Sequence, residues 1–370
     1  MNKNRRRFLQ ASILGTAAAA TGGLSQTAAA KEGQKETQQG MDILILGGTG
    51  FIGPHMVREA LRRGHSVSLF NRGKTNNELF PDLKLYAGDR DGGLDALKGG
   101  HWDAVIDNSG YVPRHVADSA RLLKFASSHY LYVSTISTYA SFGVPNDEKS
   151  PLGKLDDETV EEVTGETYGP LKALCEKRVT AEIDADKLTI LRPTYICGPG
   201  DKTDRFTYWP VRTARGGDML WPGTPADDIQ IIDVRDFANF TIDCLEQRMT
   251  GVYNTVTPVG SCTMGDLHDD SLAVSASDMN AIWVDSHFID EHELAVPIWS
   301  SPQGEYSKVA MINGEKAVAA GLKNRPVRET ARDALAWWKT LPEERTSAPR
   351  AGLDPAKEAE ALAMWSTKKS

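Results

Sequence analysis

A tyrosine and a lysine stand four residues apart in the segment Tyr168-Gly-Pro-Leu-Lys172. At this spacing two side chains share one face of a helix, and Pro170 is tolerated because the first helical turn needs no N–H donor there. A tyrosine with a pKa of about 10 is a poor base at neutral pH, but a nearby ammonium favours the phenolate. The pair therefore predicts Tyr168 as an acid or base that exchanges a proton with a substrate hydroxyl.

Two hydroxyl residues, Ser134 and Thr135, close an apolar run that begins at Tyr130 and has the pattern of a strand. A hydroxyl at this strand end would hydrogen-bond the reacting oxygen of a substrate and orient it toward Tyr168. From the residues alone, either Ser134 or Thr135 could have this role. An isolated motif of this kind could equally be a tyrosine and a lysine on the protein surface. The neighbouring motifs in the sequence decide between this interpretation and the catalytic one.

A glycine-rich turn at 47–53 follows an apolar strand pattern and opens a helical one. Gly47 permits a tight turn, Gly50 lets the backbone approach a pyrophosphate, and Gly53 allows close packing. The N-terminus of the next helix offers free N–H groups to phosphates. The turn predicts a site for NAD(P), with Lys172 on its nicotinamide ribose. The residues expected at the phosphates are Gly47, Thr49, Gly50, Phe51, Ile52 and Gly53.

The second strand pattern ends at Asn71-Arg72, where most NAD sites have an acidic residue for the ribose hydroxyls. Asn71 has no charge to repel a 2′-phosphate, and Arg72 could bind one. We therefore expect NADP to be favoured over NAD. The alternative is a solvated Arg72, with Asn71 bonding the ribose of NAD. Later strand ends add cofactor candidates: Asp89 and Arg90 at the adenine edge, Asn108 and Ser109 at the adenosine ribose, and Pro193.

Strand and helix patterns alternate from residue 41 to residue 193, which implies an α/β fold with a doubly wound parallel Rossmann sheet. After Pro193 the sequence becomes rich in Gly, Pro and aromatic residues. We expect a smaller, discontinuous C-terminal substrate lobe there. The expected boundaries are 41–193 and 228–258 for the Rossmann domain, 194–227 and 259–340 for the lobe, and 341–370 for a loosely attached tail.

The segment from Asp204 to Pro210 combines arginine with aromatic residues. Aromatic faces suit the C–H surfaces of sugars, and arginine suits phosphate or carboxylate. Packing of Phe206 and Trp209 in a core is the alternative. The expected substrate contacts are Arg205, Tyr208, Arg212 and Arg235.

The N-terminus has the three parts of an export signal. Arg5-Arg6-Arg7 precedes a mildly apolar run, and Ala28-Ala29-Ala30 offers a cleavage site. Paired arginines are typical of the twin-arginine route, which carries folded proteins. We expect residues 1–30 to direct the chain to the twin-arginine export machinery and so to the periplasm or another extracytoplasmic space. Residues 31–40 read as a linker.

The composition excludes some classes of function. A net charge of −8 over 370 residues argues against a general nucleic-acid binder, which needs a basic face. The four cysteines form no C-x-x-C pair and no zinc spacing, so we expect no metal site. They read as buried apolar residues, although a disulfide in an exported protein remains open.

Together these motifs resemble the extended short-chain dehydrogenases, also called NAD-dependent epimerases and dehydratases. The resemblance covers nearly all of 41–340 and is carried by the turn at 47–53, the strand at 130–135, Tyr168 with Lys172, and the segment at 191–201. It implies an NAD(P)-dependent oxidoreductase, epimerase or dehydratase that acts on a hydroxyl-bearing carbon of a sugar or similar small molecule.

The same resemblance assigns the catalytic hydroxyl to Thr135, where the family usually has Ser. The Asn71-Arg72-Gly73 strand end looks like an atypical branch that also contains chloroplast stem-loop RNA-binding proteins. The alternative function is therefore a non-catalytic NAD(P)- or RNA-binding protein on the same fold. A homodimer through a four-helix contact is the family expectation.

Overall fold

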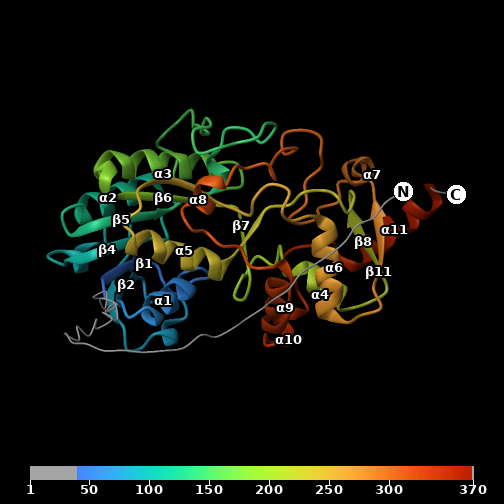
Figure 1. Ribbon diagram of the computed structural model, residues 1–370, viewed down its shortest axis with the longest axis horizontal. Coiled ribbons are helices and arrows are strands. Elements are labelled where there is room, and N and C mark those ends of the chain that lie inside the picture. Colours follow the sequence, from blue (N-terminus) through green and yellow to red (C-terminus); the bar gives the residue numbers. More distant parts are fainter. Residues whose placement is uncertain (1–39, 369–370) are drawn as a thin grey trace, which may run out of the picture. The chain divides into compact units, whose positions relative to one another are not determined.

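Seven parallel strands form the central sheet of the computed structural model, which describes residues 40–368 (Figure 1). Their order is β10-β6-β5-β4-β1-β2-β3. The chain reverses its winding between β1 and β4, and ligands bind at such a point beyond the carboxyl ends of the strands. The expected α/β Rossmann fold is confirmed. The strands are β1 (Asp42–Leu46), β2 (Ser66–Asn71), β3 (Lys84–Ala87), β4 (Trp102–Asp107), β5 (Ser127–Val133), β6 (Leu188–Pro193) and β10 (Gly251–Thr255).

Helices cover both faces of this sheet, α2 and α3 on one and α1 and α5 on the other (Figure 1). Strand β1 shows why, because its apolar residues alternate between the faces. Ile43 and Ile45 pack on the side of α1 and α5, while Leu44 and Leu46 pack on the side of α2 and α3. The helices are α1 (Gly53–Arg62), α2 (Pro113–Leu123), α3 (Tyr168–Glu182) and α5 (Val234–Glu246).

A second hydrophobic core belongs to the lobe, and its centre is aromatic. Trp209 and Trp221 are fully buried there, with ring centroids 4.6 Å apart. Phe206 is also fully buried, so the core-packing alternative holds for Phe206 and Trp209. The lobe contains α4 (Tyr208–Thr213), β8 (Asp218–Pro222), α6 (Met264–Ser275), β11 (Asn280–Val284), α7 (Ser286–Glu291), α9 (Val327–Trp338), α10 (Glu343–Thr346) and α11 (Pro355–Lys368).

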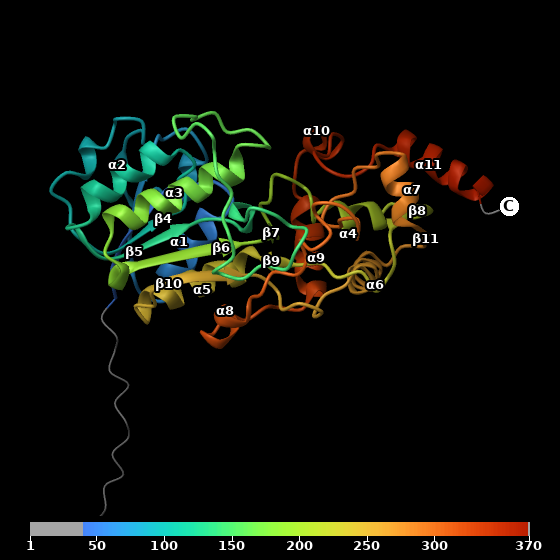
Figure 2. The same ribbon diagram turned by 90° about the horizontal axis from the view of Figure 1, so that it is seen from above.

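A parallel pair of short strands, β7 (Tyr195–Cys197) and β9 (Ile231–Asp233), lies between the sheet and the lobe (Figure 2). Strand β9 falls within the expected Rossmann range 228–258, yet it pairs with β7 and not with the seven-stranded sheet. Conversely, α8 (Glu315–Ala319) falls within the expected lobe but buries Ala317 against the Rossmann core. The remaining short helices are η1 (Asn77–Leu79), η2 (Asp95–Leu97), η3 (Ile136–Thr138) and η4 (Ala185–Lys187).

The C-terminal segment is an integral part of the lobe, so the expected loose attachment of 341–370 is wrong for the residues described. Ala361 and Trp365 are buried in the lobe core. The buried carboxylate of Glu358 accepts hydrogen bonds from Arg212 Nε at 2.7 Å and from the backbone N–H of Leu220 at 3.1 Å. The apolar side chains of α11 thus complete a core that the rest of the chain leaves open.

The remaining predictions concern the N-terminus, the cysteines, membrane-spanning helices and metal sites. The export signal at 1–30 and the linker up to residue 39 lie outside the described residues. All four cysteines are buried and unpaired with one another. Between residues 40 and 368, no helix has the length and apolarity needed to cross a membrane. In the same range, no group of three or more His, Cys, Asp or Glu side chains is arranged to hold a metal ion.

Candidate active site

A cavity of about 1050 Å³ opens where the carboxyl ends of β1, β4, β5 and β6 meet the lobe. Its wall includes the glycine turn, the end of β5, the start of α3 and part of the lobe. Tyr168, Lys172, Thr135 and Arg205 all line it, although they come from three separate stretches of sequence. The fold therefore brings the main predicted catalytic residues to one place.

The glycine turn has the geometry of a phosphate loop. Gly47 has φ +113°, a left-handed conformation that side chains rarely adopt. A Cβ on Gly53 would lie 2.4 Å from the Cα of Gly48, so only glycine fits at this helix start. No side chain caps α1, and its first turn has no acidic residue. The helix end is therefore free to meet an anion. Of the predicted phosphate residues, the cavity wall contains Gly47, Gly50, Phe51 and Ile52.

The strand end after β4 also suits a dinucleotide. Asn108 and Ser109 both line the cavity, and Ser109 Oγ donates a hydrogen bond to the carbonyl of Leu46 at 3.1 Å. Asn108 Oδ1 is buried, and no partner for it exists among the residues described. A buried acceptor without a donor is costly, and a ribose hydroxyl would satisfy it. Pro193 lines the cavity at the end of β6.

The residues at the ends of β2 and β3 lie outside the cavity wall. Asn71 uses its amide locally: Oδ1 accepts from the N–H of Gly73 at 2.8 Å, and Nδ2 donates to the carbonyl of Gly47 at 3.4 Å. Arg72 and Asp89 are exposed, with 4.0 Å between their charged atoms. Thr49 is buried and does not line the cavity.

Arg90 is not available to a cofactor, so the prediction that it meets the adenine edge is wrong. Its guanidinium is buried and forms a bidentate ion pair with Asp107, at the end of β4. It also donates to Ser119 Oγ at 2.6 Å. A buried carboxylate without a partner is costly, which explains why Asp107 holds this arginine inside the protein.

Lys172 is buried beneath the cavity, and all three protons of its ammonium group form hydrogen bonds within the protein. Nζ donates to the carbonyl of Gly110 at 2.7 Å, to the carbonyl of Val133 at 2.7 Å and to Tyr132 Oη at 2.6 Å. Burial lowers the pKa of Lys172 from 10.5 to about 8. These contacts fix the ammonium at the floor of the site, where the ribose of a nicotinamide cofactor is expected.

Tyr168 lies at the first position of α3, beside the ring of Tyr111 at a centroid distance of 6.4 Å. Burial raises the pKa of the Tyr168 phenol and Tyr111 adds to the rise, while a hydrogen bond from Thr135 and the charge of Arg205 lower it. The expected lowering by Lys172 is not among the main influences, because Nζ contacts Tyr132 instead. Burial therefore favours the protonated form of the Tyr168 phenol.

Thr135, rather than Ser134, presents its hydroxyl to Tyr168. Side chains alternate along β5, so Tyr132 and Ser134 point to the side of α3. Ser134 Oγ donates to the carboxylate of Glu176 on α3, and both residues are buried. Thr135 follows the end of the strand, and its Oγ accepts from the N–H of Ser137 at 3.2 Å. Ser134 is therefore a structural residue.

Two of the predicted substrate residues, Tyr208 and Arg212, form contacts within the lobe and do not face the cavity. Tyr208 is buried edge-on against Trp209, with ring centroids 5.1 Å apart. Arg212 pairs with Glu358 at 2.7 Å and donates to the carbonyl of Asp218 at 2.6 Å. Neither lines the cavity, so these predictions are wrong. Both residues are on α4, whose packing the sequence pattern did not reveal.

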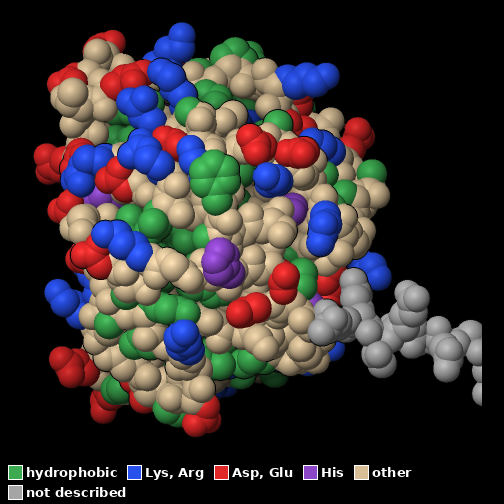
Figure 3. Space-filling view, turned by 90° about the vertical axis from the view of Figure 1, so that its left-hand side faces the viewer, with side chains coloured by type: hydrophobic (Ala, Val, Ile, Leu, Met, Phe, Trp, Pro, Cys, Tyr) green, Lys and Arg blue, Asp and Glu red, His purple; other side chains and the backbone are tan. Residues whose placement is uncertain are grey.

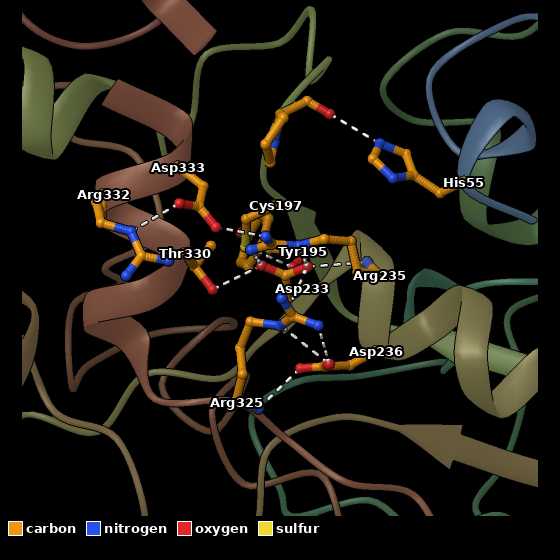
Figure 4. A network of polar contacts seen from close by, with 11 residues as sticks. His55, Tyr195, Cys197, Asp233, Arg235, Asp236, Arg325, Thr330, Arg332 and Asp333 are labelled. Carbon is orange, nitrogen blue, oxygen red and sulfur yellow. Dashed lines mark hydrogen bonds and ion pairs between the residues drawn. The ribbon is translucent and has the colours of Figure 1, made fainter. Parts of the chain in front are cut away.

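Arg235 is also wrong as a substrate contact, because it belongs to a network that joins α5 to α9 (Figure 4). Its guanidinium pairs with Asp233 at 2.7 Å and with Asp333 on α9. Thr330, also on α9, donates to the same oxygen of Asp233, Oδ2, at 2.7 Å. Arg325 pairs with Asp236 at 2.6 Å in the same network. The segment Asp233-Val234-Arg235-Asp236 thus joins the lobe to the Rossmann domain.

The cavity wall also contains residues that the sequence did not single out. Tyr111 lies two residues after the predicted strand-end residue Ser109. Tyr132 does not line the cavity, but it accepts a hydrogen bond from Lys172, and the alternation of β5 could have identified it. No local signal marks Tyr306 or Arg350, because only the tertiary fold brings 300–311 and 345–351 to the site. The further residues of the wall that lie outside the predictions include Ser137, Phe142, Tyr195, Asp201, Lys202 and Thr203.

A family model and several known proteins are similar to this chain. Residues 43–259 match the model of the NAD dependent epimerase/dehydratase family. A 2-alkyl-3-oxoalkanoate reductase of Stenotrophomonas maltophilia (strain K279a) is 31% identical over 189 residues, covering 44% of this chain and 53% of that protein. Chloroplast stem-loop binding protein of 41 kDa b of Arabidopsis thaliana is 25% identical over 227 residues, covering 55% and 54%. The chain spans about half the length of these curated relatives.

Solved structures agree on the fold. The Bordetella bronchiseptica enzyme WbmG, solved in complex with NAD and UDP, aligns with a TM-score of 0.59 at 18% identity, covering 82% of this chain and 96% of that chain. The family model covers the glycine turn, the end of β5, and Tyr168 with Lys172, all of which meet at the cavity. The chain therefore belongs to the NAD-dependent epimerase/dehydratase family of extended short-chain dehydrogenases.

Proposed function

We propose that this protein is an NAD(P)-dependent oxidoreductase, epimerase or dehydratase that acts on a hydroxyl-bearing carbon of a sugar or similar small molecule. Tyr168 is its acid or base. The observation that carries the proposal is the meeting of Tyr168, Thr135 and the glycine turn in one cavity. Hydride chemistry needs these parts together: a held cofactor, a group that orients the reacting oxygen, and a group that exchanges its proton.

The roles follow from the contacts. A bound nicotinamide supplies the hydride acceptor or donor. The free N–H groups at the start of α1 would hold its phosphates, and Asn108 Oδ1 would accept a ribose hydroxyl. Lys172 would bond the second ribose by exchanging one of its three protein acceptors for a ribose hydroxyl. Thr135 orients the substrate oxygen. Tyr168 gives its proton to that oxygen in the reducing direction, or takes it back in the oxidising direction when positive charge nearby favours the phenolate.

Aromatic side chains in the cavity wall favour a carbohydrate-like substrate. Phe142 and Tyr306 stack at a centroid distance of 5.7 Å and an interplanar angle of 15°. Tyr195 lies in the wall beside them. Flat rings suit the C–H faces of sugars. The proposed export through the twin-arginine route favours a free sugar, glycoside or other small alcohol or ketone over a nucleotide sugar.

NADP is the proposed cofactor, with NAD as the alternative. Arg72 is exposed at the end of β2, and its one ionic partner, Asp89, is 4.0 Å away among the residues described. An exposed guanidinium with so loose a partner can turn to a 2′-phosphate. The amide of Asn71 is engaged within its own turn, which favours this role for Arg72 rather than Asn71.

A non-catalytic binding protein is the second candidate, because one relative is a chloroplast stem-loop binding protein. The net charge of −8 argues against binding of RNA. On the face of the Rossmann domain drawn in Figure 3, basic and acidic side chains are interspersed, and no broad basic patch is visible there. The Tyr168 and Lys172 pair, which a binding protein would not need, also favours the enzyme.

A homodimer remains a family expectation. The outer faces of α2 and α3 would form the four-helix contact, but the chain's own segment at 154–167 is tied to them. Glu161 pairs with Arg114 on α2 at 2.8 Å, and Glu158 pairs with Lys177 on α3 at 2.8 Å. A dimer through these helices would have to include or displace that segment.

The variant Tyr168→Phe tests the proposed function. Turnover is followed by nicotinamide absorbance with a panel of sugars, alcohols and ketones, and cofactor affinity by fluorescence titration. We expect kcat to fall by about 100-fold or more with cofactor affinity unchanged, because only the acid or base is removed. The matched control is Tyr86→Phe on β3, outside the cavity wall. Full turnover in Tyr168→Phe would refute the assigned role.

A further inference from the structure

One side chain, His55, links the glycine turn to the loop that leads into the lobe side of the cavity. His55 is the third residue of α1, so it lies in the first turn of the helix that the glycine turn opens. Its Nε2 lies 3.0 Å from the carbonyl oxygen of Pro199, in the loop that follows β7 (Figure 4). Because a carbonyl oxygen only accepts, Nε2 carries the proton and donates this hydrogen bond. The bond joins two segments that are 144 residues apart in the sequence.

The same loop packs closely against the glycine turn. Gly200 has φ +95°, and a Cβ added to it would lie 3.4 Å from the ring of Phe51. Phe51 lines the cavity and packs edge-on against His55, with ring centroids 6.4 Å apart. Glycine at position 200 therefore lets the backbone of the loop approach both the glycine turn and the first turn of α1.

The two ends of the loop at 198–205 are held by different parts of the molecule. Among residues 40–368, His55 is the one side chain that hydrogen-bonds to residues 198–200. At the other end, the buried carboxylate of Asp204 accepts from Arg345 Nη2 at 2.5 Å and from the backbone N–H of Arg350 at 2.8 Å. The C-terminal segment thus fixes one end of the loop, and His55 of the Rossmann domain fixes the other.

The loop carries a charge that acts on the proposed acid or base. Arg205 lines the cavity, and its guanidinium lies over the ring of Tyr195, 4.9 Å from the ring centroid. This charge is close enough to Tyr168 to lower the pKa of its phenol. Because the interaction of two charges falls with distance, a shift of the loop would change this effect. The position of the loop therefore matters for proton transfer at Tyr168.

His55 is a neutral imidazole in these surroundings. Burial is the main influence and lowers its pKa, while the hydrogen bond to Pro199 raises it. Among the charged groups that face the ring, Arg58 of α1 and Arg235 of α5 lower the pKa, and Asp233 of β9 raises it. A neutral imidazole that donates from Nε2 has no proton on Nδ1, so the ring is a directed donor rather than a charge.

We propose that His55 is a positioning residue that couples occupancy of the glycine turn to the position of the loop at 198–205. An anion at the start of α1 orders the glycine turn and the first turn of the helix, and the bond from His55 to Pro199 extends that order to the loop. The inference rests on the proposed function, because the anion is the pyrophosphate of the nicotinamide cofactor. Since such coupling is reciprocal, a loop held by His55 also favours binding at the glycine turn.

Hydrogen exchange measured by mass spectrometry on the full chain, without nucleotide and with saturating NADP or NAD, tests the coupling. In wild-type protein we expect the nucleotide to slow amide exchange both at 48–62 and at 198–205. His55→Phe keeps a ring but removes the donor, so exchange at 48–62 should still slow, while the slowing at 198–205 should fall about fivefold. His55→Gln has an amide N–H that can replace the one on Nε2, so it should recover part of the effect. The matched control is His101→Phe, which changes an exposed histidine outside the cavity wall and should leave both segments as in wild type.

The coupling is refuted by a slowing at 198–205 that is as large in His55→Phe as in wild type, or by wild-type protein in which only 48–62 responds. Equal losses in His55→Gln and His55→Phe would assign the effect to packing of the imidazole, which also overturns the proposal. Slowing at neither segment, together with no nucleotide binding in a fluorescence titration, would refute the proposed function instead. In that case the exchange at 198–205 in nucleotide-free protein, compared between wild type and His55→Phe, still decides whether His55 holds the loop.

Discussion

Lys172 illustrates what one buried charge contributes to this site. The side chain is 3% exposed, and three acceptors from the neighbouring strand ends take its protons. A buried ammonium is costly unless every proton has a partner, which explains this arrangement. The partners come from Gly110, Tyr132 and Val133, so the position of Nζ depends on the ends of β4 and β5 rather than on α3 alone.

The pKa of Lys172 makes a testable prediction about stability. It is about 8 in the folded protein and 10.5 ordinarily. Between these values the unfolded chain holds a proton that the folded chain has released, so this group makes the free energy of unfolding rise with pH. Below pH 8 both states hold the proton, and the burial penalty is present in full. Urea unfolding from pH 8 to pH 10 should show a steeper rise for wild type than for Lys172→Met. Parallel curves would contradict the assignment.

At the residue scale, spacing predicted which side chains share a face but not which partner each one takes. Tyr168 and Lys172 meet the same cavity as predicted, yet Lys172 contacts Tyr132. Arg90 lies after a strand end as predicted, but it pairs with the buried Asp107 and not with a cofactor. Which buried charges pair with one another depends on the tertiary structure, and the spacing of residues along the sequence does not reveal it.

Helix α3 is positioned by a buried ion pair as well as by packing. Glu176, two turns beyond Tyr168, pairs with Arg192 of β6 at 2.6 Å and accepts from Ser134 at the end of β5. Arg192 also lies over the ring of Tyr139, 5.1 Å from its centroid. The pair links the helix that carries Tyr168 to two strands of the sheet.

The variant Glu176→Gln should therefore be strongly destabilised. Removing one partner leaves the buried charge of Arg192 without compensation, at a cost of roughly 3 kcal/mol or more in the free energy of unfolding. The matched control is Glu182→Gln on the same helix, whose pair with the exposed Arg121 should contribute about 1 kcal/mol or less. Denaturant unfolding measures both. Equal losses in the two variants would show that the buried pair has no special role.

At the element scale, long periodic segments were predictable and short ones were not. The strands of the Rossmann sheet and helices α1, α2, α3 and α5 follow the sequence pattern closely. Helix α4 and strands β7 and β8 do not stand out, because they are short, and α4 and β8 each contain a Pro. Their stability comes from a shared core around Trp209 and Trp221 rather than from local periodicity.

At the scale of the whole molecule, the C-terminal segment completes the hydrophobic core of the lobe. Helix α11 adds Ala361 and Trp365 to a core that begins at β7, and Arg345 reaches back to Asp204. A polar sequence rich in Ala, Glu and Lys suggested a loose tail at 341–370. Its apolar residues are few, and only the partner surface shows that they are buried. The segment thus links the stability of the lobe to the geometry of the candidate site.

A chain that ends at Thr340 should have an unstable lobe. It lacks the buried Trp365 and Ala361 and leaves Arg212 without Glu358. Loss of a buried tryptophan alone costs about 3–5 kcal/mol, so Tm should fall by roughly 5 °C or more. Calorimetry against a chain shortened only by residues 369–370 makes the comparison. An unchanged Tm would mean that α11 contributes little to the core.

The central claim is that the cavity holds a nicotinamide cofactor. The most direct test is mass spectrometry of the small molecules released from protein purified under native conditions. We predict NADP in stoichiometric amount, which would support the role of Arg72; NAD instead would keep the enzyme and overturn the proposed preference. An empty protein that binds neither nucleotide when it is added back at millimolar concentration would contradict the account.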